Sequence, residues 1–586
     1  MSIFKKSDQS QLDILRHSAA HLLAAAVLEL WPGTKNTIGP SIANGFYYDF
    51  EFKKPISEND LEKIETKMHE LIADWNEFKR EEVTVERAKQ AFSENKYKLE
   101  LIDEFAEEGK TLSFYHSGKF TDLCRGGHVE KPNKELKYFK LLSLAGAYWR
   151  GSEKNTMLTR IYGTAFPTKK ELDEYMLMLE EAKKRDHRKI GQEQELFFFD
   201  QAVGKGLPMW LPKGTIIKNE IEKYAIAMET QYGYDRVSTP HLAKEELYLT
   251  SGHLPYYKDS MYPPMEMDDG TYYLKAMNCP HHHLIYKSKP RSYRDLPIRL
   301  AEYGTVYRNE LSGTLAGLLR VRSLQMNDAH IYCSKDQIKD EVNKVIELTL
   351  QVFKAFKLTD FWFRLSKWSP EHKEKYFDEP ENWEYCQNIL REVLIANKVE
   401  FEEADDEAAF YGPKIDVQFK SVIGREETMS TIQLDFVAKT RFQLMYTDNE
   451  GHDNNEVFVI HRAPLSTHER FIAFLIEHFA GIWPVWLSPI QVGILSVSKE
   501  HHEYCNTLAS KFTTAGIRTD VDNANETVGN KIRKATKDKI PYILVIGEKE
   551  IKSEHLMVRV RGQQELLEIG TDEFIARVLQ EIKDKI

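Results

Sequence analysis

The chain has 586 residues, of which 42% are hydrophobic and 11% aromatic, and its formal net charge is −11 at pH 7. At roughly 150 residues per domain, this length predicts three or four domains, and the ordinary apolar share with well-mixed charge excludes disorder as the bulk state. The negative balance disfavours nonspecific coating of nucleic acid, which requires Lys and Arg to release counterions, but it is compatible with local basic patches.

The sequence shows no signal for secretion or for a membrane span. The opening MSIFKKSDQS lacks the apolar core of a signal peptide, and the apolar stretch from Ala19 to Trp31 contains two polar residues and is too short to cross a bilayer of about 30 Å. Five scattered cysteines lack the close pairing of a secreted disulfide scaffold: Cys124, Cys279, Cys333, Cys386 and Cys505. We therefore predict a cytoplasmic protein.

Hydrophobic periodicity divides the chain into four parts. Residues 7–168 alternate short apolar runs with turn signals and include the helical stretch SAAHLLAAAVLELW, which predicts an α+β domain. In residues 169–190, apolar side chains recur at intervals of three and four residues, which predicts a connecting helix. Across 191–484, strand-like and helical runs alternate and favour a mixed or antiparallel sheet with helices. After the helix-breaking WPVWLSP, residues 485–586 alternate as βαβ units do.

The first candidate site lies in the N-terminal part. His17 and His21 are four residues apart and share one face of the predicted helix, and CRGGH supplies Cys124 and His128. Taken alone, this donor set is typical of a four-ligand zinc site. A lone HxxxH pair is more often two ordinary helix histidines, so both interpretations stay open from the residues alone.

Two further segments carry candidate phosphate-binding arginines. From Arg308 to His330, a strand-like run ends in Arg and Glu, a Gly-containing loop follows, and a second predicted strand carries Arg320. Two guanidinium groups on such a hairpin can hold a triphosphate, because Arg offers paired donors that match phosphate oxygens. In HRAPLSTHERFIAFLIEH, Arg470 lies on an amphipathic helix. Surface arginines and an ordinary packed helix are the default interpretation of these segments.

These two segments resemble motifs 2 and 3 of class II aminoacyl-tRNA synthetases, and the chain as a whole resembles the threonyl-tRNA synthetase family of bacterial type. The resemblance covers almost the whole chain and rests on motifs in the family's order and approximate spacing: HSAAH, CRGGH, AGAYWRG, RDHRKIG, MNCP, SYRDLP, RNE, RVR, NDAHIYC, FYGPKID, IQLDF, HRA and ERF. It implies a multidomain α+β and α/β fold, with an editing domain at 7–168, a linker helix at 169–190, a class II antiparallel catalytic core at 191–484 and an α/β anticodon-binding domain at 485–586.

The resemblance implies an ATP-dependent, AMP-forming ligase that makes threonyl-adenylate and transfers threonine to the 3′ end of tRNA(Thr). ATP with Mg²⁺ would be contacted by Arg308, Arg320 and Arg470, whose charges stabilise the attack on the α-phosphate. One Zn²⁺ per subunit would be held by a set with one open position: Cys279, His330 and His461. The family's amino-acid pocket maps onto three further residues: Asp328, Tyr411 and Gln433.

A zinc ion with an open position can take the amino group and the hydroxyl of threonine, which excludes valine. Serine keeps the hydroxyl and lacks one methyl group, a difference worth only roughly 1–3 kcal/mol, so a second sieve is needed. The N-terminal domain resembles the family's editing domain, which hydrolyses seryl-tRNA(Thr), and six residues map onto its pocket: His17, His21, Lys98, Asp122, Cys124 and His128. The resemblance favours a metal-free pocket over the zinc interpretation.

The resemblance also implies how the protein binds its partners. Asn525, Glu550 and Arg559 match base-reading positions, and an unpaired anticodon can be read by hydrogen bonds to its base edges. A homodimer is implied as well, because GTIIKNEIEKYAIAME and Pro240 match the dimer-forming motif 1.

Several positions depart from the family's pattern. The small domain that usually precedes the editing domain is expected to be missing, because HSAAH begins at residue 17. Ser466 and Thr467 stand where Gly and Ser are typical, and Ser466 adds a side chain beside the expected substrate site, where Gly allows close backbone approach. We expect catalysis to survive with altered kinetics or inhibitor sensitivity. Other departures are Gly127, His281, Leu311 and Met326.

Two other functions compete with a synthetase: a non-catalytic RNA-binding paralogue, and a free-standing deacylase with a vestigial core. The retained zinc positions and the two motif 2 arginines disfavour both.

Overall fold

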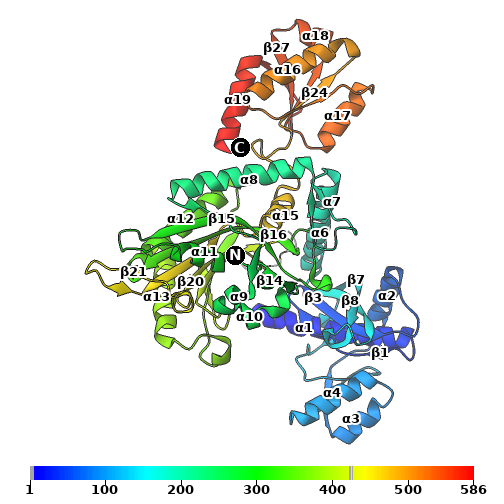
Figure 1. The fold of residues 1–586 in the computed structure, drawn as a ribbon. Helices are drawn as coiled ribbons and strands as arrows, with labels where there is room; N and C mark the ends of the chain where they lie inside the picture. Colours follow the sequence, from blue (N-terminus) through cyan, green and yellow to red (C-terminus); the bar gives the residue numbers. More distant parts are fainter. Residues whose placement is uncertain (1–5, 422–423, 425) are drawn as a thin grey trace. The chain divides into compact units, whose positions relative to one another are not determined.

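The computed structural model describes residues 6–421, 424 and 426–586 (Figure 1). Residues 1–5, where the sequence shows no signal-peptide core, lie outside the described residues. The chain divides into two compact units, Met1–Glu180 and Glu181–Ile586. None of the described helices is long and apolar enough to cross a membrane.

The N-terminal unit is built around a buried helix, α1 (Lys6–Leu30), whose segment from Ala19 to Val27 is buried on all sides. Its alanines let strands and a second helix pack closely, and α1 contacts β3, β8 and α2. In this part of the chain the sheet order is β1-β3-β8-β7, with β2 beside β3 and antiparallel pairing throughout. These elements are β1 (Lys35–Asn36), β2 (Ser41–Ile42), β3 (Gly45–Glu51), α2 (Leu61–Ile72), β7 (Tyr138–Tyr148) and β8 (Met157–Phe166).

A smaller layer of the same unit positions the candidate editing residues. Three antiparallel strands lie in the order β4-β5-β6, and α4 contacts both β5 and β1. The Asn95 side chain caps α4 by accepting the backbone N–H groups of Tyr97 and Lys98. The helix begins at Lys96, and the buried Lys98 lies in its first turn. The elements are β4 (Lys79–Val83), α3 (Val85–Ala91), α4 (Lys96–Glu107), β5 (Leu112–Ser117), β6 (Phe120–Leu123) and α5 (Pro132–Glu135).

The single helix predicted for residues 169–190 is two helices. α6 (Lys169–Arg185) ends before Asp186, and α7 (His187–Glu193) begins after it. Asp186 has a non-helical backbone with φ −50° and ψ 121°, and its side chain accepts the Arg188 N–H at 2.8 Å. The prediction of one helix was wrong here because apolar periodicity does not register an Asp that caps a new helix.

The core of the second unit is a sheet of eight described strands, ordered β11-β15-β16-β23-β20-β19-β17-β18. All pairs are antiparallel except β11–β15 and β17–β18, which confirms the predicted antiparallel core. The strands are β11 (Asp235–Arg236), β15 (Ile298–Tyr307), β16 (Ser323–Ser334), β17 (Phe361–Ser366), β18 (Phe401–Ala404), β19 (Lys414–Lys420), β20 (Glu426–Asp435) and β23 (Val457–Ala463). Arg320 was predicted on the second hairpin strand, but β16 begins at Ser323 and Arg320 lies in the preceding loop.

Helices and small strand pairs surround this sheet. The apolar faces of α12 and α15 bury residues in the same hydrophobic core as the sheet strands. The helices are α8 (Pro212–Gln231), α9 (Glu245–Ser251), α10 (His253–Tyr256), α11 (Cys279–Lys287), α12 (Ile338–Ala355), α13 (Pro380–Ala396), α14 (Ala438–Phe442) and α15 (His468–Phe479). The short strands are β9 (Phe197–Phe198), β10 (Met209–Trp210), β12 (Leu242–Lys244), β13 (Met265–Met267), β14 (Gly270–Leu274), β21 (Tyr446–Thr447) and β22 (Asp453–Asn454).

The C-terminal part is an α/β domain with its own hydrophobic core. Its sheet has the order β25-β24-β26-β27-β28, in which β24 is parallel to both neighbours and the last two pairings are antiparallel. The predicted βαβ alternation is thus confirmed. The elements are β24 (Val492–Ser496), α16 (His502–Thr514), β25 (Thr519–Asp522), α17 (Val528–Lys537), β26 (Tyr542–Ile546), α18 (Glu548–Lys552), β27 (His555–Val560), β28 (Leu566–Gly570) and α19 (Thr571–Asp584).

Candidate functional site

Strand register brings a possible metal-binding group together in the catalytic core. His330 on β16 is paired directly with His461 on β23, and Cys279 is the first residue of α11. One ligand atom from each of these three residues lies within 4.8 Å of the other two. These residues are far apart in the sequence, so their spacing did not predict that they lie together. Only the resemblance implied it.

The chemistry of these three side chains fits a zinc ion. Burial lowers the pKa of His330 well below its ordinary value, so the imidazole is neutral, as a metal ligand must be. Burial, with the carboxylates of Asp328 and Asp435, raises the pKa of the Cys279 thiol well above its ordinary value. A divalent cation reverses that effect by favouring the thiolate. One Cys and two His leave one tetrahedral position for a substrate.

The residues predicted to line the amino-acid pocket lie next to this group. Gln433 on β20 is paired with His461, and the Tyr411 hydroxyl donates to Gln433 Oε1. Asp328 lies two residues before His330 on β16 and therefore on the same face of the sheet. Asn278 Nδ2 donates to Asp328 Oδ2 at 3.2 Å.

Sequence reasoning missed Asp435, which is buried beside the metal-binding group. His461 Nε2 lies 3.1 Å from Asp435 Oδ2, and both residues line a pocket of about 30 Å³ with Cys279 and Tyr411. The signal was present in IQLDF, where an acidic residue at the end of β20 is flanked by Leu434 and Phe436. A buried carboxylate at such a position requires a partner, and that requirement could have identified it.

The three predicted ATP-contacting arginines meet different neighbours. Arg308 follows β15, and its Nε is buried without a hydrogen-bond partner among the described residues. Arg320 pairs with Glu310 at 2.8 Å, and Arg470 pairs with Glu427 at 2.9 Å. A buried guanidinium nitrogen that lacks an acceptor is suited to an anionic ligand.

The N-terminal unit brings all six predicted editing residues into one polar cluster. His17 Nε2 lies 3.1 Å from Cys124 Sγ, and His128 Nε2 lies 3.7 Å from the same sulfur. The Gly126 backbone N–H also donates to this sulfur, at 3.3 Å. The sulfur of Cys124 is therefore surrounded by hydrogen-bonding nitrogens.

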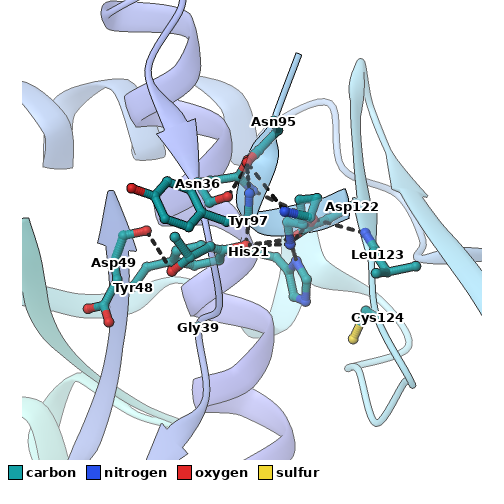
Figure 2. A network of polar contacts seen from close by, with 12 residues as sticks. His21, Asn36, Gly39, Tyr48, Asp49, Asn95, Tyr97, Asp122, Leu123 and Cys124 are labelled. Atoms are coloured by element: carbon teal, nitrogen blue, oxygen red, sulfur yellow. Dashed lines mark hydrogen bonds and ion pairs between the residues drawn. The ribbon is translucent and has the colours of Figure 1, made fainter. Parts of the chain in front are cut away.

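Asp122 is the buried centre of the adjoining network, which Figure 2 shows. Lys98 Nζ lies 2.5 Å from Asp122 Oδ1, and His21 Nδ1 lies 3.3 Å from Oδ2. Tyr48 donates its hydroxyl to Asp122 Oδ2 at 2.6 Å, and Asn36 Nδ2 donates to that hydroxyl at 3.0 Å. Sequence reasoning missed Tyr48 and Asn36 because residues on short alternating strands give no spacing signal.

Burial and hydrogen bonds shift the pKa values of Cys124, His21 and His128 in this cluster. Burial opposes ionisation of the Cys124 thiol, but hydrogen bonds from His128, His17 and His21 lower its pKa to about 3. Burial also opposes the charge of His21, yet its contacts with Asp122 and Cys124 raise its pKa to about 9. Burial lowers the pKa of His128. At neutral pH the cluster holds a thiolate, a charged His21 and a neutral His128 that can accept a proton.

This cluster opens into a pocket of about 490 Å³. Its polar wall includes His17, His21, Lys98, Asp122 and Cys124. Its other wall includes Ile38, Pro40, Leu101 and Phe105. His17, His21, Cys124 and His128 also have ligand atoms within 4.8 Å of one another, so the geometry alone is compatible with the zinc interpretation. The size and the mixed lining suit a nucleoside ester.

The structure places the three predicted anticodon-binding residues on separate elements of the C-terminal domain. Asn525 is exposed in the loop between β25 and α17, and Arg559 is exposed on β27. Glu550 lies on α18, where its Oε2 accepts the Gly547 N–H at 3.0 Å. Their base-reading roles stay predictions.

Three family models match parts of the chain. The tRNA synthetase class II core domain (G, H, P, S and T) matches residues 263–479, and an anticodon binding domain matches residues 491–581. The threonyl and alanyl tRNA synthetase second additional domain matches residues 112–162.

The chain is also similar to whole proteins. It is 49% identical to a threonine–tRNA ligase of Geobacillus sp. (strain WCH70), covering 100% of this chain and 90% of that protein. It is likewise 49% identical to threonine–tRNA ligase 1 of Bacillus subtilis (strain 168), covering 100% of this chain and 91% of that protein. Among solved structures, the RNA binding domain of threonyl-tRNA synthetase from Cryptosporidium parvum Iowa II aligns with a TM-score of 0.64 at 34% identity, covering 68% of this chain and 98% of that one.

Proposed function

The chain belongs to the threonine–tRNA ligase family of class II aminoacyl-tRNA synthetases, and from this premise we propose that it makes threonyl-tRNA(Thr) from threonine, ATP and tRNA(Thr) and hydrolyses seryl-tRNA(Thr). The observation that carries the proposal is the group of Cys279, His330 and His461 beside Asp328 in a class II sheet. Neither an RNA-binding paralogue nor a free-standing deacylase has use for such a group.

Threonine would be selected at this group. Cys279, His330 and His461 would hold a zinc ion, which would supply an open coordination position for an amino acid bearing a side-chain hydroxyl. Asp328 is suited to orient the ammonium or hydroxyl group, and the paired Tyr411 and Gln433 are suited to position its polar atoms.

Activation joins the threonine carboxylate to the α-phosphate of ATP, and pyrophosphate leaves. Arg308, Arg320 and Arg470 would stabilise the negative charge that develops on the phosphates, with ATP bound as its Mg²⁺ complex. The carboxylates that hold Arg320 and Arg470 are then exchanged for phosphate oxygens. In the second step a hydroxyl of the terminal ribose of tRNA attacks the activated carbonyl, and AMP leaves.

Hydrolysis of seryl-tRNA would occur in the N-terminal pocket without a metal. The neutral His128 can take a proton from the attacking water, while the charged His21 stabilises negative charge on the ester oxygen. The Lys98–Asp122 pair holds His21 in place.

We assign residues 7–168 to editing, 169–190 to the connection, 191–484 to aminoacylation and 485–586 to anticodon binding, with Asn525, Glu550 and Arg559 contacting anticodon bases. The matches at 112–162, 263–479 and 491–581 fall inside these ranges and support the assignment. We further propose a cytoplasmic homodimer that forms through the motif 1 helix α8, with one zinc ion in each subunit.

The test is exchange of pyrophosphate into ATP with threonine, serine or valine, on protein whose zinc content has been quantified. We expect strong exchange with threonine, weaker exchange with serine and none with valine. Equal exchange with valine would contradict selection through a hydroxyl, and no exchange with any amino acid would favour the RNA-binding paralogue.

A further inference from the structure

A buried chain of hydrogen bonds runs from His330 into the protein. His330 Nδ1 lies 2.8 Å from His282 Nδ1, and His282 Nε2 lies 3.2 Å from Glu302 Oε2. Glu302 in turn accepts the Thr239 backbone N–H on Oε1 at 2.7 Å. His282 on α11 is fully buried, and Glu302 on β15 is 5% exposed. Water therefore cannot replace these contacts.

Glu302, at the end of this chain of hydrogen bonds, determines which atom donates and which accepts at each step. A carboxylate only accepts hydrogen bonds, so His282 Nε2 carries a proton and donates it to Glu302. A neutral imidazole has one donor and one acceptor, and His282 Nδ1 is then the acceptor. Only the Nδ1–H of His330 can fill that place. His330 is left with an unprotonated Nε2, whose lone pair is free.

A buried lysine also pairs with Glu302. Lys275 Nζ is fully buried, lies 3.7 Å from Glu302 Oε1 and donates to the Thr239 hydroxyl at 2.8 Å. Glu302 therefore already has a cationic partner. Burial opposes the charge of Glu302, but its hydrogen bonds with His282 and Thr239 and the charge of Lys275 lower its pKa to about 2, so it is a carboxylate that accepts the hydrogen bond from His282 Nε2.

We infer that Glu302 and His282 are positioning residues that fix the tautomer of His330, so that its Nε2 lone pair is available to the metal ion. The inference rests on the proposed zinc site. Neither residue needs to touch zinc or substrate, because their effect passes through the ring of His330. Outer partners of this kind typically change metal affinity by about 10–100-fold.

Glu302→Gln tests the direction of these hydrogen bonds, because the Gln side chain has nearly the same shape as that of Glu. The amide oxygen would stay with the Thr239 N–H, and the amide NH₂ would then face His282 Nε2. This donor forces His282 Nε2 to accept, so Nδ1 becomes the donor and His330 must offer its own Nδ1 lone pair. His330 then carries its proton on Nε2, in the tautomer that cannot bind the metal.

The experiment measures the zinc dissociation constant of the full chain by competition with a chromophoric chelator. We expect Glu302→Gln to weaken zinc binding by about 10–100-fold. His282→Leu, which removes the acceptor for His330, should weaken it to a similar extent and provides a second variant should one fold poorly. The absorption spectrum of the cobalt-substituted protein reports whether the ligand geometry has changed.

Glu341→Gln is the matched control. Glu341 is a buried carboxylate of the same domain, but it pairs with Arg299 at 2.6 Å and has no part in the chain to His330. We expect its zinc affinity to match that of the unmodified protein. Equal zinc affinity in Glu302→Gln and Glu341→Gln would overturn the inference while the zinc site stands. An unmodified protein that holds no stoichiometric zinc would overturn the zinc site and the inference with it.

Discussion

His330 and His461 are directly paired across β16 and β23, although 130 residues lie between them in the chain. This pairing brings both imidazoles to one face of the sheet, where Cys279 reaches them from the start of α11. Two antiparallel strands that share several hydrogen-bonded pairs form a rigid base for such a group.

The first prediction concerns Cys279→Ser. Because a hydroxyl is a much poorer zinc ligand than a thiolate, we expect zinc to be lost and threonine-dependent pyrophosphate exchange to fall by roughly 100-fold or more. Metal analysis and exchange kinetics on the same sample check this. Cys386→Ser, at a buried thiol on α13 outside the metal-binding group, should retain both properties. Full activity of Cys279→Ser would contradict the site assignment.

How much of the candidate sites could be predicted depends on how far apart their residues lie in the sequence. The pair His17 and His21 follows from helical periodicity alone, because four residues make one turn. His330 and His461 have no such local relationship, and only a resemblance to a known family brought them together. His282 and Asp435 were not predicted in any role, because their importance lies in buried contacts that the register of β15, β16, β20 and β23 creates.

The second prediction separates editing from synthesis. Cys124→Ala should lower the rate of seryl-tRNA(Thr) hydrolysis by roughly 100-fold, because the thiolate that orders His17 and His128 is lost. Charging with threonine should stay close to normal, since Cys124 lies in the N-terminal unit. Deacylation of preformed seryl-tRNA measures the effect, with Cys505→Ala as the control. Unchanged deacylation in Cys124→Ala would count against the editing assignment.

The third prediction follows from the pKa of Cys124, which hydrogen bonds from three histidines lower to about 3 against the effect of burial. The thiolate is the form that iodoacetamide attacks, and it is fully populated at every pH well above 3. The alkylation rate of Cys124, followed by mass spectrometry, should therefore stay nearly constant between pH 5 and 8. The rate for a free cysteine peptide should fall about tenfold per unit below its pKa. A comparable fall at Cys124 would show that its thiol is not ionised.

The fourth prediction concerns Ser466, which stands where the family typically has glycine and has a φ of +52°. An L-residue in this left-handed region is strained by about 1 kcal/mol relative to glycine, so Ser466→Gly should raise the thermal midpoint of the catalytic core by roughly 1–3 °C. Ala480→Gly is the control, since Ala480 has a φ of +50° at the end of α15. If only Ala480→Gly stabilises the protein, the Ser466 side chain makes contacts that offset its strain.

The fifth prediction tests the role of Arg470 in activation. Its guanidinium pairs with Glu427 at 2.9 Å, and a third of the Arg470 side chain is exposed, so the ion pair itself contributes little to stability. Arg470→Ala should therefore fold normally, yet lower kcat for pyrophosphate exchange by roughly 10²–10³-fold, because charge on the phosphates develops most strongly in the transition state. Arg391→Ala, which removes a comparable pair with Glu403, should leave kcat unchanged. A rise in the KM for ATP with kcat preserved would instead assign Arg470 to ground-state binding.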